Sequence, residues 1–209
     1  MKLGVISDIH GDVSGLELAW SHLTVMGAEK IVSAGDLAGY GPFPDRVVAF
    51  LREHKISSVR GNHDRWAVER GPGIADPFGG GAPSADTLEY LADLSVSLHL
   101  YLPPGVAIFH GSPRSDMEFV NRSTHPPKVL RAYLSEQSCR FVILGHTHKP
   151  MCFRCPEGLV INPGSIVSIA AIDSSRTFAL VDSFTEDVSF HDVETGDAVE
   201  VETCSWPLG

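Results

Sequence analysis

The first third of the chain alternates between apolar runs typical of buried strands and segments with helical periodicity. The run 3–6 and the run that begins at Ile31 have the length and apolar character of buried strands. Between them, apolar residues recur at helical spacing after Asp12, a residue type that often caps a helix. The sequence predicts a second helix over 44–54 and a third strand over 57–59. This β-α-β-α-β order predicts a parallel sheet covered by helices.

The rest of the chain adds more strands, with antiparallel pairing expected toward the end. The expected elements are a Gly- and Pro-rich loop over 71–84, a helix over about 85–94, strands on both sides of 103–105, a helix from about Pro126, a strand over 141–144, a hairpin of 151–153 with 159–161, and short strands from Thr177 onward. No repeat or compositional break marks a linker in the 209 residues. We therefore predict one domain over 1–209 with an α/β fold. Two mixed β-sheets are expected to pack face to face with helices outside, as a four-layer α-β-β-α sandwich.

The charge and the cysteine content of the chain exclude several classes of function. The 26 acidic and 16 basic residues give a net charge of −10, a field that repels phosphate backbones, so stable nucleic-acid binding and docking on anionic membranes are not expected. The four cysteines do not form a disulfide scaffold, and Cys152 and Cys155 are expected to be packing residues rather than a zinc or redox pair. The apolar run after Lys2 is too short for a signal peptide, so we expect a cytoplasmic protein with reduced thiols.

Five apolar segments each end in Asp, Asn or His next to a glycine. They are VISDIHG at 5–11, IVSAGD at 31–36, VRGNHD at 59–64, AIFHG at 107–111 and VILGHTH at 142–148. In α/β sheets, ligands bind in the crevice beyond the carboxyl ends of the strands. We therefore expect these side chains to meet at one edge: Asp8, His10, Asp36, Asn62, His63, Asp64, His110, His146 and His148.

This set of side chains suits a metal centre. Imidazole and carboxylate groups together bind divalent transition metals, and nine such groups exceed the needs of one ion. Two ions that share a carboxylate form the clamp used for in-line displacement at phosphorus. Asp8 and His10 are two residues apart, as are His146 and His148, so an extended backbone would point each pair to one face. A single histidine at a strand end is more often structural, but the ordered set is difficult to explain by structure alone.

The ordered motifs SDIHG, SAGD, RGNHD, FHGSP and LGHTH resemble those of the calcineurin-like metallophosphoesterase family. The segment GDLAGYGPFPDRVV, which begins at Gly35 and contains Asp36, is similar to that of a bacterial branch of small, single-domain phosphoesterases. The resemblance implies one metal at Asp8, His10 and His148, a second at Asn62, His110 and His146, and Asp36 as the bridge between them. It also implies that His63 is the catalytic histidine and that Asn62 and His63 contact the phosphate.

The expected function is that of a dinuclear metal-dependent phosphoester hydrolase. A hydroxide bridging two divalent ions would attack phosphorus, with His63 as an acid or a phosphate contact. Manganese is the first expectation for the metal, and iron, zinc, nickel and magnesium are alternatives. Two other functions stay open: a Ser/Thr phosphoprotein phosphatase that uses the same site, and a metal-binding scaffold without turnover.

The substrate is expected to be a small phosphoester, either a phosphodiester or a nucleotide-like compound, because the short chain leaves few residues to build a peptide groove. The entrance would be lined by the turn 40–43, Arg65 and Trp66, the loop 71–84, and the segment 112–114, with Arg114 contacting polyphosphates. A packing role for these rings, with the arginines paired to surface acids, stays open. So do two roles for Asp64, which could orient His63 or shape a turn.

Overall fold

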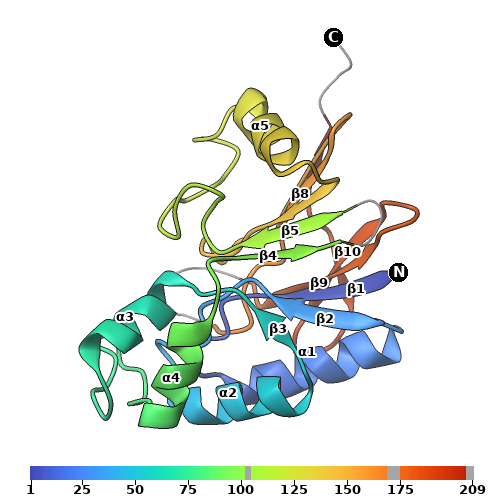
Figure 1. Cartoon of the computed structure of the whole chain (residues 1–209). Helices are drawn as coiled ribbons and strands as arrows, with labels where there is room; N and C mark the ends of the chain where they lie inside the picture. Colours follow the sequence, from blue (N-terminus) through green and yellow to red (C-terminus); the bar gives the residue numbers. More distant parts are fainter. Residues whose placement is uncertain (102–104, 169–174, 206–209) are drawn as a thin grey trace.

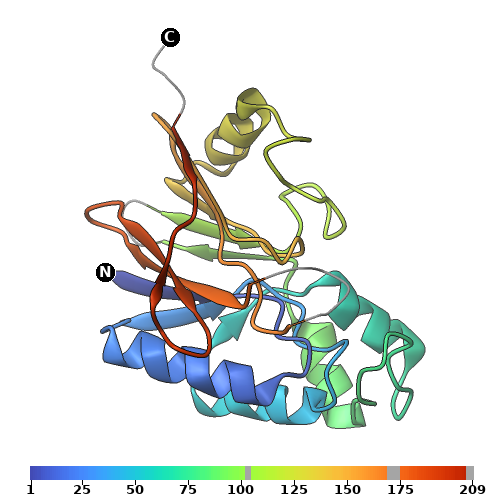
Figure 2. The same cartoon turned by 180° about the vertical axis from the view of Figure 1, so that it is seen from behind.

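The computed structural model describes residues 1–101, 105–168 and 175–205 and places their strands in two facing sheets (Figure 1). The first sheet has the strand order β11-β10-β9-β1-β2-β3. Its strands are β1 (Lys2–Ile6), β2 (Lys30–Ser33), β3 (Ser57–Ser58), β9 (Thr177–Asp182), β10 (Val188–Asp192) and β11 (Ala198–Val199). β1, β2 and β3 are parallel, whereas β9 pairs antiparallel with both β1 and β10. Figure 2 shows the orange-to-red β9 and β10 continuing the sheet beside the blue β1.

The second sheet has the order β12-β7-β8-β6-β5-β4. Its strands are β4 (Ser97–Leu100), β5 (Val106–Phe109), β6 (Phe141–Ile143), β7 (Met151–Cys155), β8 (Gly158–Asn162) and β12 (Thr203–Ser205). β5, β6 and β8 run parallel, while β4 and β7 pair antiparallel with β5 and β8. Both sheets are therefore mixed, as the sequence predicts.

The described helices are α1 (Val13–Val25), α2 (Pro44–Glu53), α3 (Asn62–Arg70), α4 (Ala85–Asp93) and α5 (Pro127–Gln137). Helices α1, α2 and α4 lie on the outer side of the first sheet and α5 on that of the second, whereas α3 lies beyond the strand ends beside α4 (Figure 1). Buried residues of α1, α2 and α4 share one apolar core with the first sheet, and those of α5 share another with the second sheet. A third core fills the space between the sheets.

The alternation of side chains along each strand produces these separate cores. Ile6 packs toward the helices, whereas its neighbour Val5 packs between the sheets. In β6, Phe141 and Ile143 face the first sheet and Val142 faces α5. Neighbouring residues of a strand point to opposite faces, so each strand supplies two cores, and burying one such side chain contributes about 1.5–3 kcal/mol. The four-layer α-β-β-α sandwich predicted from the sequence is confirmed.

The predicted elements agree with the observed ones to within a residue or two. The loop 71–84 contains no helix or strand, and Asp12 caps α1 by accepting a hydrogen bond from the backbone of Gly15 at 2.9 Å. Cys152 lies between the sheets and Cys155 on the α5 side, which fits packing roles. Residues 103 and 104 of the predicted turn lie outside the described residues. None of the described helices combines the length and the apolar character that crossing a bilayer requires.

Candidate metal centre

The five sequence motifs meet at one edge of the sandwich, where parallel strands of both sheets end. Three of the strands belong to the first sheet and two to the second. In the first sheet, the loop after β1 carries Asp8 and His10, the loop after β2 carries Asp36, and α3, which follows β3, begins with Asn62 and His63. In the second sheet, His110 follows β5, and the loop after β6 carries His146 and His148. The topology thus gathers side chains more than a hundred residues apart in the sequence.

Asp8, His10 and His148 form the first group of side chains that could bind a metal ion. Asp8 Oδ1 lies 3.3 Å from His148 Nε2 and 3.7 Å from His10 Nε2, and the two Nε2 atoms are 3.1 Å apart. All three residues are buried. Asp8 Oδ1 and His148 Nδ1 have no hydrogen-bond partner among the described residues. Buried polar atoms without partners are rare, and a bound cation would satisfy the Asp8 oxygen.

The second group lies on the other side of Asp36. Asp36 Oδ2 is 3.2 Å from His110 Nε2, which is 3.0 Å from Asn62 Oδ1. His146 places a ring nitrogen within 4.8 Å of donor atoms of Asp36 and His110, and its Nε2 has no partner among the described residues. Asp36 Oδ2 also lies 3.6 Å from His10 Nε2 of the first group. Asp36 therefore stands between the two groups.

Backbone carbonyls fix the orientation of two of these imidazoles. His10 Nδ1 lies 2.9 Å from the carbonyl oxygen of Ala38, and His110 Nδ1 lies 2.8 Å from that of Ala34. A carbonyl oxygen only accepts, so each Nδ1 donates its hydrogen. In the neutral ring the lone pair is then on Nε2, which faces the carboxylates in both residues. Such outer hydrogen bonds commonly orient histidines that bind metals.

Five of the proposed ligands adopt a left-handed backbone. Their φ angles are 52° at Asp8, 48° at His10, 54° at Asp36, 68° at His146 and 56° at His148. This region costs a non-glycine residue about 1–2 kcal/mol and is concentrated at functional sites. Asp8 and His10 share one donor group, as their spacing predicts, but His146 and His148 belong to different groups, so that part of the prediction is wrong. Tight turns, rather than the extended backbone that the spacing suggests, place these side chains.

Two glycines allow the loops to approach each other. A Cβ on Gly61 would collide with the Asp36 carboxylate and lie 2.5 Å from the Asp36 backbone nitrogen. A Cβ on Gly145 would collide with Ser7 Oγ and lie 3.0 Å from Asp8 Oδ2. The glycines of RGNHD and LGHTH are therefore required by close approach of side chains that carry the site.

Burial and neighbouring charges set the protonation of the ligands. Burial raises the pKa of Asp8, but His148 more than offsets this and lowers it to about 2. Burial also opposes ionisation of Asp36, yet His110 and His10 hold its pKa far below the ordinary value. Burial lowers the pKa of His10 to about 4, whereas Asp36 overcomes burial at His110 and raises its pKa to about 10. At neutral pH both carboxylates are thus ionised, and His110 holds a proton that a metal would displace.

His63 lies beside the second group and faces an aspartate that the sequence did not indicate. Its backbone N–H donates to Asp36 Oδ1 at 2.8 Å, and its Nδ1 lies 3.8 Å from Asp76 Oδ2. Arg70 holds the same Asp76 oxygen at 2.6 Å. Asp64 instead accepts hydrogen bonds from the backbone of 37, 38 and 61, so it shapes the turn and does not orient His63. The loop around Asp76 has no periodic pattern, so only the presence of a lone acid among its Gly and Pro residues could have drawn attention to it.

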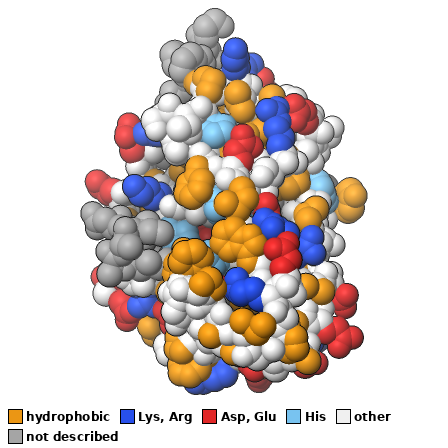
Figure 3. All heavy atoms as spheres, turned by 90° about the vertical axis from the view of Figure 1, so that its left-hand side faces the viewer, with side chains coloured by type: hydrophobic (Ala, Val, Ile, Leu, Met, Phe, Trp, Pro, Cys, Tyr) orange, Lys and Arg blue, Asp and Glu red, His pale blue; other side chains and the backbone are white. Residues whose placement is uncertain are grey.

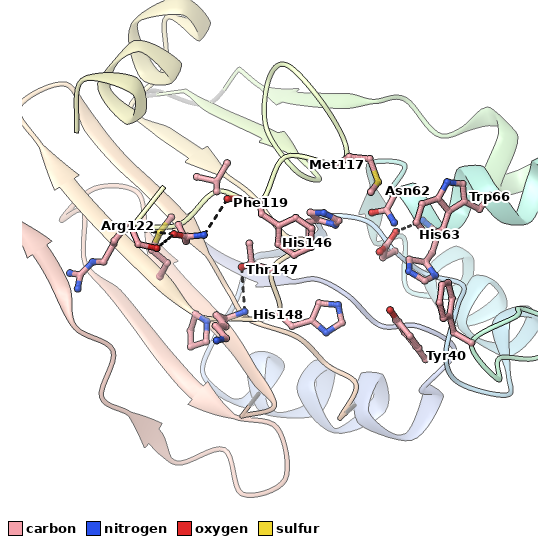
Figure 4. A pocket seen from close by; sticks show the side chains of 18 residues that line it. Tyr40, Asn62, His63, Trp66, Met117, Phe119, Arg122, His146, Thr147 and His148 are labelled. Carbon is pink, nitrogen blue, oxygen red and sulfur yellow. Dashed lines mark hydrogen bonds between the residues drawn. The ribbon is translucent and has the colours of Figure 1, made fainter. Parts of the chain in front are cut away.

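A cavity of about 830 Å³ opens over the site (Figure 4). As predicted, Tyr40, Trp66 and the loop 71–84, through Phe78, line it. The prediction for Arg114 is wrong, because its guanidinium pairs with Glu136 at 3.2 Å and is not part of the lining.

The basic side chains that line the cavity are not the two arginines that the sequence analysis predicts, Arg65 and Arg114. Arg65 is held by Asp116 at 2.8 Å and by Glu69 at 3.2 Å and does not line the cavity. Arg122 and Lys149 line it instead. The positive charge at the entrance therefore comes from segments that the sequence did not single out.

Comparison with known proteins agrees with this geometry. The family model of the calcineurin-like phosphoesterase superfamily domain matches residues 1–186. The chain belongs to the calcineurin-like phosphoesterase superfamily. Members of this superfamily are phosphoester hydrolases, so the resemblance seen in the motifs is confirmed at that level.

Two solved structures and one curated relative show how similar this calcineurin-like chain is to individual proteins. It is similar to a metallophosphoesterase from Sphaerobacter thermophilus (25% identity, TM-score 0.74, covering 93% of this chain and 88% of that one). It shares its fold with Yfce, a phosphoesterase from E. coli (22% identity, TM-score 0.62, 96% and 97% covered). A stretch of 62 residues is 39% identical to an uncharacterized protein of Methanocaldococcus jannaschii. That stretch is 30% of this chain and spans only 26% of the relative's length.

Proposed function

We propose that this calcineurin-like domain is a dinuclear metal-dependent phosphoesterase that hydrolyses small phosphoesters. The observation that carries the proposal is the position of Asp36, whose Oδ2 lies 3.2 Å from His110 Nε2 and 3.6 Å from His10 Nε2. A carboxylate between two groups of donors can be shared by two ions. The site also forms part of the lining of a cavity large enough for a small ligand, which a purely structural metal site does not need.

The ligand sets follow from the two groups. One ion would be held by Asp8, His10 and His148. The other ion would be held by Asn62, His110 and His146, and both ions would share Asp36. The donor atoms are carboxylate oxygens, an amide oxygen and imidazole nitrogens, a set that fits manganese, iron, zinc and nickel, and less well magnesium. We propose manganese as the working metal.

The residues that face the cavity would act on the substrate. When bound, the two ions would supply Lewis-acid stabilisation of the phosphoryl oxygens and lower the pKa of water. Asn62 lines the cavity, where its amide can donate to a phosphoryl oxygen. His63 also lines the cavity and is assigned to proton donation toward the leaving oxygen, which contributes about 10²–10⁴-fold in rate.

Hydrolysis of bis(para-nitrophenyl) phosphate, with manganese and after chelation, tests the proposal. We expect turnover that requires the metal and is lost in the variant His63→Ala while its metal content is retained. Metal binding without turnover of any phosphoester would support the scaffold alternative. Phosphopeptides hydrolysed far faster than small diesters would support a phosphoprotein phosphatase instead.

A further inference from the structure

Large apolar side chains remain exposed on both sides of the candidate metal centre. Among the described residues, Phe78 is 58% exposed, Phe119 56% and Met117 41%, and all three line the cavity over the site. The face in Figure 3 shows hydrophobic side chains gathered around pale blue histidine atoms. Apolar surface that is exposed in a concave site commonly marks where a ligand binds. This exposure points to apolar groups on the ligand itself.

Tyr40, Trp66 and Phe78 form the first wall of the cavity. The rings of Tyr40 and Phe78 are 5.6 Å apart, and the ring of Trp66 lies 4.8 Å from that of His63. Phe78 is held in place because its backbone N–H donates to Asp76 Oδ1 at 2.9 Å. The first wall is thus a set of aromatic faces and edges anchored by a buried carboxylate.

Met117 and Phe119 form the second wall, from a different part of the chain. The ring of Phe119 lies 4.2 Å from the ring of His146. Glu118, between them in the sequence, accepts a hydrogen bond from the hydroxyl of Tyr133 at 3.1 Å. This bond fixes the segment that carries the second wall. A binding surface fixed in advance loses less conformational entropy when a ligand binds.

The rings of the two walls contact different histidines of the candidate metal centre. Trp66 of the first wall packs on His63 and Phe119 of the second packs on His146, and Figure 4 shows these two pairs apart from each other. Asp36 has a donor atom within 4.8 Å of a ring nitrogen of each of these two histidines. A phosphorus atom held over Asp36 can therefore direct one ester arm toward each wall. A phosphomonoester would cover only one wall and leave the other exposed.

Few cations are available for a charged arm. Arg122 and Lys149 are the Lys and Arg side chains of the described lining, and Arg122 is paired with Glu202 at 2.7 Å. A polyphosphate arm would have to compete with that carboxylate. Aromatic rings, in contrast, bind flat uncharged groups by stacking. The lining therefore favours aromatic arms over polyanionic ones.

We propose that the substrate is a phosphodiester with a flat aromatic or heteroaromatic group on each ester arm, one against each wall. This inference rests on the proposed function, because it places phosphorus over Asp36. Phe78 and Phe119 are then specificity-determining residues, one for each arm.

Three esters with the same leaving group test the inference in the manganese-loaded protein. They are bis(para-nitrophenyl) phosphate, methyl para-nitrophenyl phosphate and para-nitrophenyl phosphate. We expect KM for the diaryl ester to be about 5- to 50-fold lower than for the methyl ester, since stacking is lost in the latter. Phe119→Ala and Phe78→Ala should each reduce this ratio. Phe184→Ala, at a residue 82% exposed in the β9–β10 turn and absent from the cavity lining, should keep it.

A binding measurement separates this inference from the proposed function. Diphenylphosphinate and dimethylphosphinate mimic the diesters but have no ester bond to hydrolyse, so calorimetry reports their affinity without turnover. We expect diphenylphosphinate to bind more tightly than dimethylphosphinate, by a factor similar to that expected for KM. This factor should be smaller in the variant Phe119→Ala. Equal affinities, or equal KM for the aryl and methyl esters, would overturn the two-wall inference and leave the hydrolase proposal standing. If no ester turns over, the proposed function fails and the phosphinate ratio still decides whether the walls bind rings.

Discussion

The carboxylate of Asp76 lies 3.8 Å from Nδ1 of His63, and Arg70 holds the same oxygen at 2.6 Å. His63 Nδ1 has no hydrogen-bond partner among the described residues, and the buried carboxylate of Asp76 lies close to it without bonding it. Burial lowers the pKa of His63, and the charges of Asp36 and Asp76 oppose that change. Asp76 is therefore placed to favour the protonated form of His63 through its charge, which makes it a candidate positioning residue.

Asp76→Asn should slow hydrolysis most where a proton is needed on the leaving oxygen. Removing the carboxylate charge lowers the pKa of His63, so less of the protonated ring is present. We expect kcat for an alkyl phosphodiester to fall by about tenfold or more, with a smaller loss for para-nitrophenyl esters, because general acid catalysis matters less for good leaving groups. Metal content should stay unchanged. Equal losses of kcat for both esters would instead show that Asp76 only maintains the structure of its loop.

Glu69→Gln is the matched control for that substitution. Glu69 lies on α3 near His63 in sequence, but its carboxylate is exposed and pairs with Arg65 at 3.2 Å. A pair of this kind contributes about 0.3–0.5 kcal/mol. The control should therefore leave the dependence on the leaving group unchanged.

Asp36→Asn should disable both metal sites together. The Asp36 carboxylate is within 3.6 Å of Nε2 of both His10 and His110, so its loss leaves neither donor group complete. We expect elemental analysis to show far fewer than two ions per chain, and turnover to fall by at least about a hundredfold. Asp12→Asn, which changes a helix cap near the site, should keep both ions. Two bound ions and normal turnover in Asp36→Asn would refute the shared-carboxylate assignment.

Much of the fold and of the candidate metal centre was predictable because the decisive signals are local. Apolar runs that end in Asp, His or Asn mark buried strands, and the topology of parallel strands brings their ends to one edge. That rule was sufficient to predict that Asp36 and His110, which lie 74 positions apart, reach the same edge, whereas their pairing at a metal was implied by the family resemblance. It needed no knowledge of how any loop is shaped.

The parts that could not be predicted depend on contacts between distant loops. Arg114 points away from the cavity because Glu136 and the ring of Tyr133, both on α5, attract its guanidinium. Asp76 reaches His63 through a loop that has no periodicity. The left-handed backbone at Asp8 is a tertiary effect as well, since residue spacing alone suggests an extended segment there.

Metal binding should release protons. In the metal-free protein, burial acts against protonation of His110 and His148, but Asp36 and Asp8 overcome it, so the pKa of His110 is about 10 and that of His148 is also raised. A metal must displace the proton from any imidazole that binds it. Calorimetry at pH 7 in buffers of different ionisation enthalpy should show release of at least about one proton per chain, and the apparent affinity should rise as the pH increases toward 9. Heats that do not depend on the buffer would contradict this protonation state.

Glu118→Gln should loosen the segment that carries Met117 and Phe119. Burial raises the pKa of Glu118, but hydrogen bonds from Ser112, His125 and Tyr133 outweigh it and hold the pKa below its usual value. A carboxylate whose pKa is depressed on folding adds stability above its unfolded pKa of about 4.3, and that stability is lost as the pH falls through the folded pKa. At pH 7 we expect the substitution to cost about 1 kcal/mol, or about 2–4 °C in Tm. The loss should shrink as the pH falls through the depressed folded pKa of Glu118, because the wild-type carboxylate is then protonated as well. Glu136→Gln, which removes an exposed pair with Arg114, should change Tm much less, and an equal change in both variants would show that Glu118 does not anchor the wall.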